Sequence, residues 1–521
     1  MLKKTWSTKK SKEVFCLNVF LSNYCVKFVL NVIFTKLWCK LNFFSTTFSL
    51  CRFLFKFKMT LLSKPLNGCA RKQWTDSVPY TCYEIGHTWE PRCTIASLDT
   101  IRDSLKFSLK VYLTFYTVTG LVKLRNKKHR NLKEIRKLFR DVLQSSVFLS
   151  ANGVLFMSSF CFFRHLFGKF YGWHGLLCGF VAGYFSLIIE RKSRRGALAL
   201  YLTNLSAEII FRAAKSNGLV HTIPNGEVLL FSLASAGFMS LFRQRDGLPE
   251  SIQTLVQYLV GKVEGHDPVT NEVKCSKVIP GRKTLLFLKK MFNRTPKHWS
   301  CPHQYGCLGY IIQGCLPRFA VGYGVEMALN ILQVIRGRKK IKDLIRISGN
   351  LSLAMFLGGF SLLFRLTNCI LRWLHGKDSP QLFGAISGLV AGSSFYFYKS
   401  PTIALYAMFK LLHILLLKLV DKGYLPDIPN IERYIYATML AIILHTACVG
   451  PQFMRPGYWR FISGVSGEKF PFMFRKLMVP FASQAMTLYP DFIPNLNPQF
   501  VKTPEVLQIL AEHGKLSGAK F

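Results

Sequence analysis

Apolar runs of helix length recur along the chain and are separated by short polar, mostly basic stretches. Two weaker segments, 104–122 and 308–335, carry charges such as Lys106 and Glu326, so we expect interfacial helices there. The remaining runs predict eight membrane spans. They lie at about 142–163, 175–190, 197–213, 227–242, 350–372, 382–398, 402–420 and 432–450.

Two of these runs contain glycine at every fourth position. Residues four apart lie on one face of a helix, so three glycines in line leave a smooth groove in which a neighbouring backbone can approach closely. We therefore predict helix-packing seams at both sets. The sets are Gly175, Gly179 and Gly183, and Gly384, Gly388 and Gly392.

The two halves of the chain resemble each other. A shift of 209 residues places GFVAG at 179–183 over GLVAG at 388–392, and a shift of 205 places Ile-Pro-Asn at 223–225 over the same triplet at 428–430. A repeat of this length indicates two related helical units. The predicted fold is an all-α multi-pass membrane protein with two repeated glycine-zipper bundles of about four transmembrane helices each, plus interfacial helices.

These patterns divide the chain into six segments. We expect an atypical N-terminal extension, which is basic and interrupted by Lys, and synthesis that begins at Met59. The segments are the extension at 1–58, a Cys-containing segment at 59–100, the first repeat at 101–247, a basic cytosolic linker with a Cys/His cluster at 248–307, the second repeat at 308–460 and a tail at 461–521.

Composition supports a membrane protein. Half of the residues are hydrophobic and 18% are charged, which argues against a soluble globular domain. The net charge of +43 could suggest a nucleic-acid partner, but the Lys and Arg residues are divided among loops and no recognition motif accompanies them. We expect no nucleic-acid partner. We expect the basic loops to face anionic lipid or to bind protein partners, and we include a homo-oligomer among the candidate assemblies.

The basic residues also predict a topology. With eight spans, most Lys and Arg fall on one side, which the positive-inside rule makes cytosolic. That side holds the segments Lys123–Arg140 and Arg336–Arg346 together with Arg243, whereas Lys215 and Arg372 fall on the opposite side.

Several long strings resemble one known family. CYEIGHTWEPRC at 82–93, LSANG at 149–153, LIIERKSRRG at 187–196 and NGEVLLF at 225–231 are similar to the transmembrane protein 135 family, also described as a peroxisomal membrane protein. The likeness runs from about Tyr80 to Pro498 and leaves out residues 1–58. More faintly, the four-helix unit resembles the mitochondrial inner-membrane translocase family.

The resemblance implies a multi-pass protein of peroxisomal or mitochondrial membranes. It also implies links to peroxisome organization, peroxisome-dependent lipid metabolism and mitochondrial shape and fission. Neither periodicity nor charge indicates these roles, and the resemblance does not specify a biochemical activity.

Cysteine and histidine gather before each repeat. Thiolate and imidazole are zinc ligands, but neither set matches a paired Cys-x-x-Cys framework, and reduced interfacial cysteines are the simpler interpretation. We therefore predict no cofactor and keep the two sets as weak metal candidates. They are Cys82, His87 and Cys93, and Cys301, His303 and Cys307, with Cys315 nearby.

Charges inside the predicted spans have two interpretations. Arg365, Lys410 and His413 could line a polar path through a bundle, or could pair across helices or extend to the interface, which we prefer. Glu208 and Arg212 lie four residues apart and should neutralise each other. The side chains of Asn225 and Asn430 should cap the helices that follow them.

The sequence contains no Gly-x-Ser-x-Gly elbow, phosphate loop, dinucleotide glycine motif or His-Glu-x-x-His pair. We therefore do not expect an enzyme. Two functional classes remain. The first is a membrane scaffold or regulator with basic cytosolic loops, and the second is a transporter or pore for a small metabolite or lipid.

Overall fold

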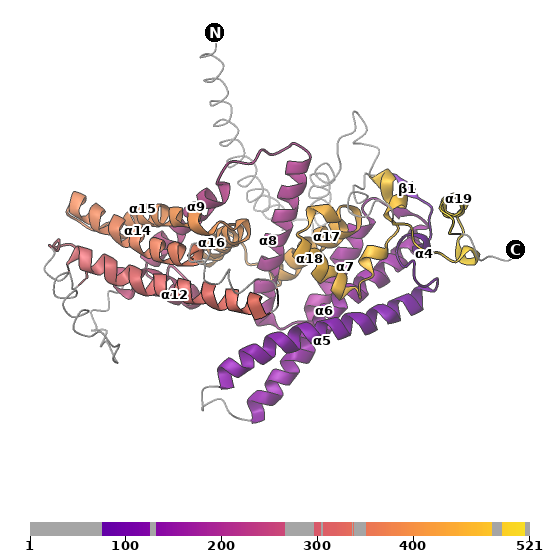
Figure 1. The fold of residues 1–521 in the computed structure, drawn as a ribbon, viewed down its shortest axis with the longest axis horizontal. Coiled ribbons are helices and arrows are strands. Elements are labelled where there is room, and N and C mark those ends of the chain that lie inside the picture. Colours follow the sequence, from indigo (N-terminus) through magenta and orange to yellow (C-terminus); the bar gives the residue numbers. More distant parts are fainter. Residues whose placement is uncertain are drawn as a thin grey trace, which may run out of the picture. The chain divides into compact units, whose positions relative to one another are not determined.

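A computed structural model describes residues 76–124, 132–265, 296–303, 306–335, 337, 351–481 and 492–515. The predicted extension at 1–58 and the basic segment at 338–346 lie outside these residues. The described chain is mostly helical and forms two compact units (Figure 1). The first unit combines residues up to His221 with residues from Leu419 onward, and the second comprises Thr222–Lys418.

The first unit is built on five long helices, with a two-stranded antiparallel sheet in which Ser77 pairs with Tyr171. Its elements are β1 (Ser77–Val78), α4 (Cys82–Ile85), α5 (Cys93–Leu124), α6 (Leu132–Phe167), β2 (Phe170–Tyr171), α7 (His174–Ile189), α8 (Lys192–Ser216), α17 (Ile431–Val449), η6 (Pro451–Phe453), α18 (Pro456–Val465), η7 (Phe470–Phe472), η8 (Arg475–Phe481), η10 (Pro498–Phe500) and α19 (Pro504–Glu512).

The second unit is also helical. Its elements are α9 (Gly226–Phe242), α10 (Glu250–Val260), η3 (Lys262–Glu264), α12 (Cys307–Ile335), α14 (Ser352–His375), α15 (Pro380–Gly392), η5 (Ser393–Tyr398) and α16 (Pro401–Asp421), the last of which ends just beyond the unit boundary.

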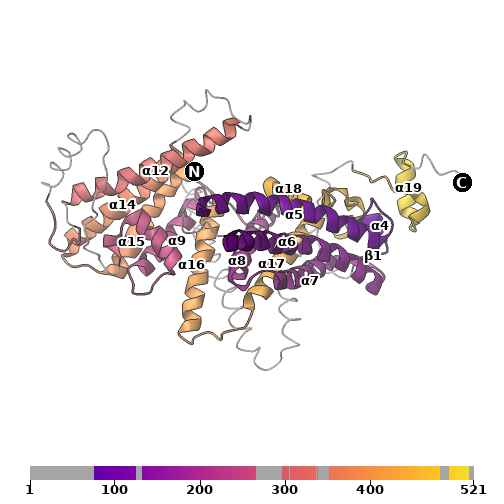
Figure 2. The ribbon, with the colours of Figure 1, turned by 90° about the horizontal axis from the view of Figure 1, so that it is seen from below.

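The last long helix in each half of the sequence packs among the helices of the other half. In the first unit α7 lies against α17, which comes from the second half of the chain. In the second unit α15 lies against α9, which comes from the first half. Figure 2 shows α9 beside α15. Each unit therefore contains four consecutive long helices and one exchanged helix.

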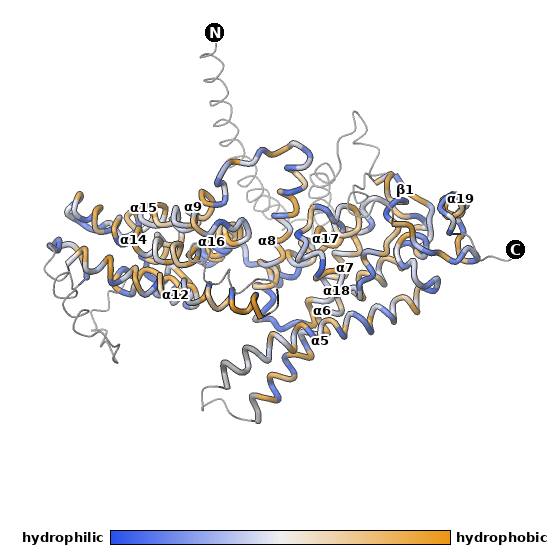
Figure 3. Tube along the Cα trace, in the orientation of Figure 1, coloured by the Kyte–Doolittle hydropathy of each residue, from blue (hydrophilic) through white to orange (hydrophobic). Residues whose placement is uncertain are grey.

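Four of the eight predicted spans are long and apolar enough to cross a membrane: α6 from Ile135, α8, α14 and α16. Helices α7 and α9 have 16 and 17 residues, about 25 Å at 1.5 Å per residue, which is shorter than the ~30 Å hydrocarbon core. The predicted span at 382–398 changes from α-helix to 3₁₀-helix at Ser393. Figure 3 shows hydrophobic residues spread along the helices of both units.

The glycines at four-residue spacing lie where the exchanged helices make their closest contacts. A methyl group at Gly179 would lie 2.6 Å from the Cα atom of Ala441 in α17. At Gly388 it would lie 2.6 Å from the carbonyl oxygen of Ser235 in α9. Similar backbone contacts involve Gly183 with Ala437, Gly384 with Met239 and Gly392 with Ser232, whereas Gly175 faces the His445 ring. A side chain at most of these positions would displace backbone, not a flexible side chain.

The predicted interfacial segments form long helices that pack lengthwise on a neighbour. Helix α5 lies beside α6, and α12 lies beside α14. The latter pair is antiparallel, because Gly314 lies against Arg365 near one end and Gly322 lies against Ala354 near the other. At that second end the Glu326 carboxylate accepts a hydrogen bond from the Leu353 amide at 2.8 Å. Neither α5 nor α12 is among the four helices long and apolar enough to span a membrane.

The predicted topology is wrong for the second unit. It placed Arg243 and Arg372 on opposite sides of the membrane, but both guanidinium groups bind the Glu264 carboxylate, at 3.0 and 2.7 Å. Helices α9 and α14 therefore end at the same place. The prediction failed because it treated 308–335 as an interfacial segment that stays on one side, whereas α12 runs antiparallel to α14, from Tyr310 beside Glu264 to Glu326 beside the start of α14.

The predicted side-chain caps at Asn225 and Asn430 are also wrong. Both residues occupy the N-cap position, but neither side chain makes a capping hydrogen bond. Both adopt the left-handed conformation, with φ of 56° and 59°. Asparagine suits this position because it tolerates positive φ better than most residues. The Asn225 side chain instead accepts a hydrogen bond from Lys399 Nζ at 2.6 Å.

We predict that Gly388→Ala destabilises the protein whereas Gly324→Ala does not. Both glycines are helical, but Gly388 is packed against backbone and a methyl group at Gly324 would meet no atom within 4 Å. Overpacking costs about 1–3 kcal/mol, while alanine at an open helical site gains up to ~1 kcal/mol. The thermal midpoint of the full chain in detergent should fall by several degrees for Gly388→Ala alone. Equal midpoints for the two variants would contradict the close seam.

We also predict that a chain cut between residues 265 and 296 reassembles from two co-expressed fragments. Each fragment lacks one exchanged helix, so the first lacks α17 and the second lacks α9. Each fragment should aggregate when it is expressed alone, and the pair should co-purify in a one-to-one ratio. Size-exclusion chromatography with an affinity tag on one fragment measures this. Monodisperse single fragments that do not associate would show that the helices are not exchanged.

Candidate metal centres

Four sulfur and nitrogen donors meet at one point in the first unit. Cys82 is the first residue of α4, His87 follows that helix, Cys93 begins α5 and Cys161 lies in α6. Their ligand atoms all lie within 4.8 Å of one another. Cys82, His87 and Cys161 are buried, and Cys93 is half-buried. We call these residues the first Cys₃His group.

A capping box positions the start of this group. The Thr81 side chain accepts a hydrogen bond from the Glu84 amide, and the Glu84 carboxylate accepts one from the Thr81 amide at 2.6 Å. Gly86 then ends α4 against the Phe160 ring, where a Cβ atom would lie only 2.8 Å from the ring. The absence of a side chain at Gly86 therefore lets this loop reach α6 beside Cys161.

The His87 ring has a fixed orientation. Its Nδ1 lies 2.6 Å from the carbonyl oxygen of Glu90, so Nδ1–H donates and Nε2 carries the lone pair. Nε2 is buried and has no hydrogen-bond partner among the described residues. A backbone carbonyl at one ring nitrogen and a free lone pair at the other is the arrangement seen in metal-binding histidines.

The second unit contains an equivalent group. Cys301 and His303 precede α12, Cys307 is its first residue and Cys369 lies in α14. The Sγ atoms of Cys301 and Cys307 are 4.0 Å apart, and Cys369 Sγ lies 3.6 Å from His303 Nε2. The His303 ring stacks on Tyr310 with centroids 4.3 Å apart. We call these residues the second Cys₃His group.

Sequence reasoning singled out three residues of each group and missed the fourth. Cys161 and Cys369 lie inside apolar runs, where a cysteine normally belongs to the core. A signal was nevertheless available, because both are followed by an arginine three residues later, in CFFR and CILR, 208 positions apart. Cys315, noted beside the second set, lies outside the group.

In each group the hydrogen bonds among the thiols favour the thiolate form of one cysteine. Hydrogen bonds from the Cys161 and Cys82 thiols lower the pKa of Cys93 well below its usual range. The hydrogen bond from Cys369 lowers the pKa of Cys301, against the opposite effect of burial, to about 4, with help from His303. Such donor sets can hold a soft tetrahedral ion or can be oxidised to disulfides.

A buried ion-pair cluster lies beside the second group. The Glu264 carboxylate is fully buried and accepts hydrogen bonds from Arg243, Arg372 and the Tyr310 hydroxyl, the last at 3.0 Å. Both arginines also bind Asp378 at 3.2 Å. Burial alone would raise the pKa of Glu264, but Arg372 and Arg243 outweigh it and lower the pKa to about 2. We call these five residues the Glu264 cluster; sequence reasoning did not find it.

The residues of the predicted polar path do not meet. Arg365 is buried against α12, donates to the Tyr310 carbonyl at 3.0 Å and lies over the Tyr310 ring. Lys410 and His413 are half-buried on α16. Within the part of the chain that the structure describes, no hydrogen bond, ion pair or ring contact joins Arg365 to either residue.

The predicted Glu208–Arg212 pair is confirmed. The guanidinium lies 2.8 Å from the Glu208 carboxylate, and Arg455 binds the same oxygen. Glu208 therefore forms a local ion-pair centre in the first unit.

We predict that Glu264→Gln strongly destabilises the second unit. Among the residues that the structure describes, the substitution leaves Asp378 as the one acid that neutralises two buried guanidinium groups, and breaking a buried ion pair costs about 3–5 kcal/mol. The control is Glu250→Gln, which removes an exposed acid at the start of α10. Denaturation of the full chain in detergent should distinguish the two. An equally small effect of both variants would exclude a structural role for the Glu264 cluster.

The pH dependence should follow from the lowered pKa of Glu264. A carboxyl group whose pKa is lower in the folded state stabilises the fold above its unfolded value, near 4.5, and this contribution is lost as the pH falls toward 2. The thermal midpoint of the wild type should therefore decrease more steeply below pH 4.5 than that of Glu264→Gln. Parallel curves would show that Glu264 does not control acid stability.

Comparison with known proteins gives one family. Residues 79–215 match the family described as the N-terminal cysteine-rich region of Transmembrane protein 135. The matched range contains all four residues of the first Cys₃His group. No solved structure matches the chain. Residues 79–215 are thus similar to the cysteine-rich region of the transmembrane protein 135 family, and this likeness and the apolar helices together support a membrane protein.

Proposed function

We propose that this protein is a non-enzymatic scaffold or regulator of peroxisomal or mitochondrial membranes. In this role it would influence organelle organisation and lipid metabolism. The choice of organelles rests on the family resemblance described above. The choice of a scaffold over a transporter rests on how the helices pack.

The closed helix seams are the observation that carries the proposal. A scaffold requires helices that hold a fixed arrangement, whereas a carrier requires helices that separate around a substrate. At Gly179 and Gly388 the helices touch through backbone atoms, which leaves no space between them. The proposal also includes a duplicated glycine-zipper unit, to which both seams belong.

The outer surfaces of the helices suit lipid. In α16 only 17% of the residues in the apolar stretch are buried, and large side chains such as Leu415 and Leu417 are exposed. At the start of α6, Arg136, Lys137 and Arg140 are exposed. Such basic residues next to an apolar helix attract anionic headgroups, each contributing about 1 kcal/mol near the surface.

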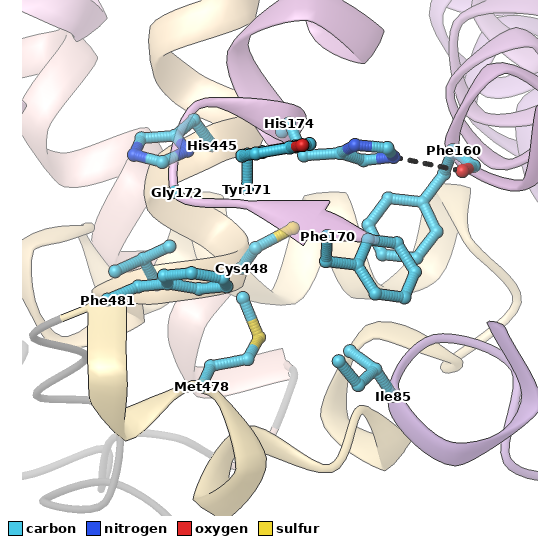
Figure 4. Close-up of a pocket in the computed structure, with 12 residues that line it drawn as sticks. Ile85, Phe160, Phe170, Tyr171, Gly172, His174, His445, Cys448, Met478 and Phe481 are labelled. Atoms are coloured by element: carbon cyan, nitrogen blue, oxygen red, sulfur yellow. Dashed lines mark hydrogen bonds between the residues drawn. The ribbon is translucent and has the colours of Figure 1, made fainter. Parts of the chain in front are cut away.

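Two cavities in the first unit are too small for a metabolite. Figure 4 shows one between α7, α17 and the C-terminal segment, lined by side chains such as Phe170, Met478 and Phe481. Its volume is about 10 Å³, roughly one water molecule. His174 lines it but donates its Nε2 hydrogen to the Phe160 carbonyl at 3.0 Å. A second cavity, beside Phe156 and Met473, measures about 30 Å³.

A flux assay separates the two functional classes. Purified full-length protein in liposomes should give no saturable flux of acyl or small polar metabolites, and Arg365→Leu and Lys410→Leu should behave like the wild type. In cells that lack the protein, Lys410→Leu should restore organelle shape, whereas Gly388→Leu should not, because it opens a seam. Saturable flux that either charge variant abolishes would favour the transporter and would overturn the scaffold.

A further inference from the structure

We propose that each Cys₃His group binds one zinc ion, so that the chain carries two structural zinc centres. The ligands are Cys82, His87, Cys93 and Cys161 in the first unit, and Cys301, His303, Cys307 and Cys369 in the second. The inference is independent of the proposed function, since it rests only on the donors and their positions.

The distances fit a tetrahedral ion. With a zinc–sulfur distance of about 2.3 Å, two thiolates on a tetrahedron lie about 3.8 Å apart. The structure places Cys301 Sγ 4.0 Å from Cys307 Sγ, and Cys369 Sγ 3.6 Å from His303 Nε2. A disulfide would need sulfur atoms at about 2.05 Å. The donors therefore already surround a point that an ion can occupy.

The donor types select the ion. Neither group contains a carboxylate, which argues against calcium or magnesium. Three thiolates and one imidazole make a closed four-coordinate set, which is typical of structural zinc, whereas catalytic zinc keeps one position open. The unpartnered Nε2 of His87 supplies the nitrogen ligand, and the Glu90 carbonyl holds its ring in the required tautomer.

Each group has an arginine near its thiols, and in the second group this arginine is already paired with Glu264 and Asp378. Zinc with three thiolates and a neutral imidazole has a net charge of −1. Arg164 and Arg372 each follow the helix cysteine by three residues, and each interacts electrostatically with a thiol of its group. Arg164 also donates to the carbonyl oxygens of Tyr80 and Pro79, at 2.6 and 2.7 Å, and so holds the segment that leads to Cys82.

The two groups reach the same donor set through different loops. The first has the spacing Cys-x₄-His-x₅-Cys and the second has Cys-x-His-x₃-Cys. In both, the loop ligands precede or begin the long helix α5 or α12, and the fourth ligand comes from its neighbour α6 or α14. Zinc would therefore link α5 to α6 in the first unit and α12 to α14 in the second.

The experiment is metal analysis of the full chain purified in detergent without chelator. Elemental mass spectrometry should find two zinc ions per chain. Cys161→Ser and Cys369→Ser should each retain one, and the double variant should retain none. Cys178→Ser and Cys315→Ser are matched controls, because these cysteines lie outside both groups, and they should retain two.

A second measurement covers variants that fail to fold. Wild-type protein depleted of zinc and loaded with Co²⁺ should show the intense visible bands of tetrahedral cobalt and a thiolate charge-transfer band, and Cys161→His should shift these bands without losing the ion. Wild-type protein with no zinc, with iron or copper in its place, or with disulfides linking the group cysteines would overturn the proposal. Retention of two zinc ions in the double variant would also overturn it.

Discussion

Direct contact between helix backbones is the constraint on which both units depend. Helices in lipid gain no hydrophobic free energy by associating, so close packing must hold them together. The contacts of Gly179 with Ala441 and of Gly388 with Ser235 provide this packing. In each case the partner helix comes from the other half of the sequence. The exchange therefore makes the folding of each unit dependent on both halves of the chain.

A second constraint is that charges within an apolar bundle must find partners. Glu264 is bound by two arginines, Asp378 neutralises the remaining charge, and Glu208 is shared by Arg212 and Arg455. These groups are immobilised by one another. These buried ion pairs consequently fix the positions of the helices that carry them. The presence of buried charged residues is therefore weak support for a transport path.

The sequence contains enough information to locate most helices, because apolar runs and their polar borders are local features. The Glu208–Arg212 pair was equally local and was predicted correctly. Helix partners were not predictable in this way. The two halves have the same pattern, and the sequence does not indicate that α9 packs against the glycine face of α15 and α17 against that of α7. The topology failed because α12, predicted to be interfacial, runs along the length of α14, so Arg243 was assigned to the wrong side relative to Arg372.

The candidate metal ligands could also be predicted only in part from the sequence. Cys82, His87 and Cys93 stood out because they are close together in a polar segment, whereas Cys161 is one apolar residue among many in α6. Only the fold brings it to the other three. The role of Asn225 was missed for a related reason, since a helix start can be recognised from sequence but the left-handed backbone that precedes it cannot.

In the second unit, the proposed zinc centre, the Glu264 cluster and the glycine seam form one continuous set of contacts. His303 stacks on Tyr310, whose hydroxyl donates to Glu264. Glu264 binds Arg243, and the Arg243 side chain packs beside Gly384 at the start of the seam. Helices α12, α14, α9 and α15 thus meet at one end of the unit. Because Cys307 is the first residue of α12, the zinc centre would hold this helix in place and so keep Tyr310 against Glu264.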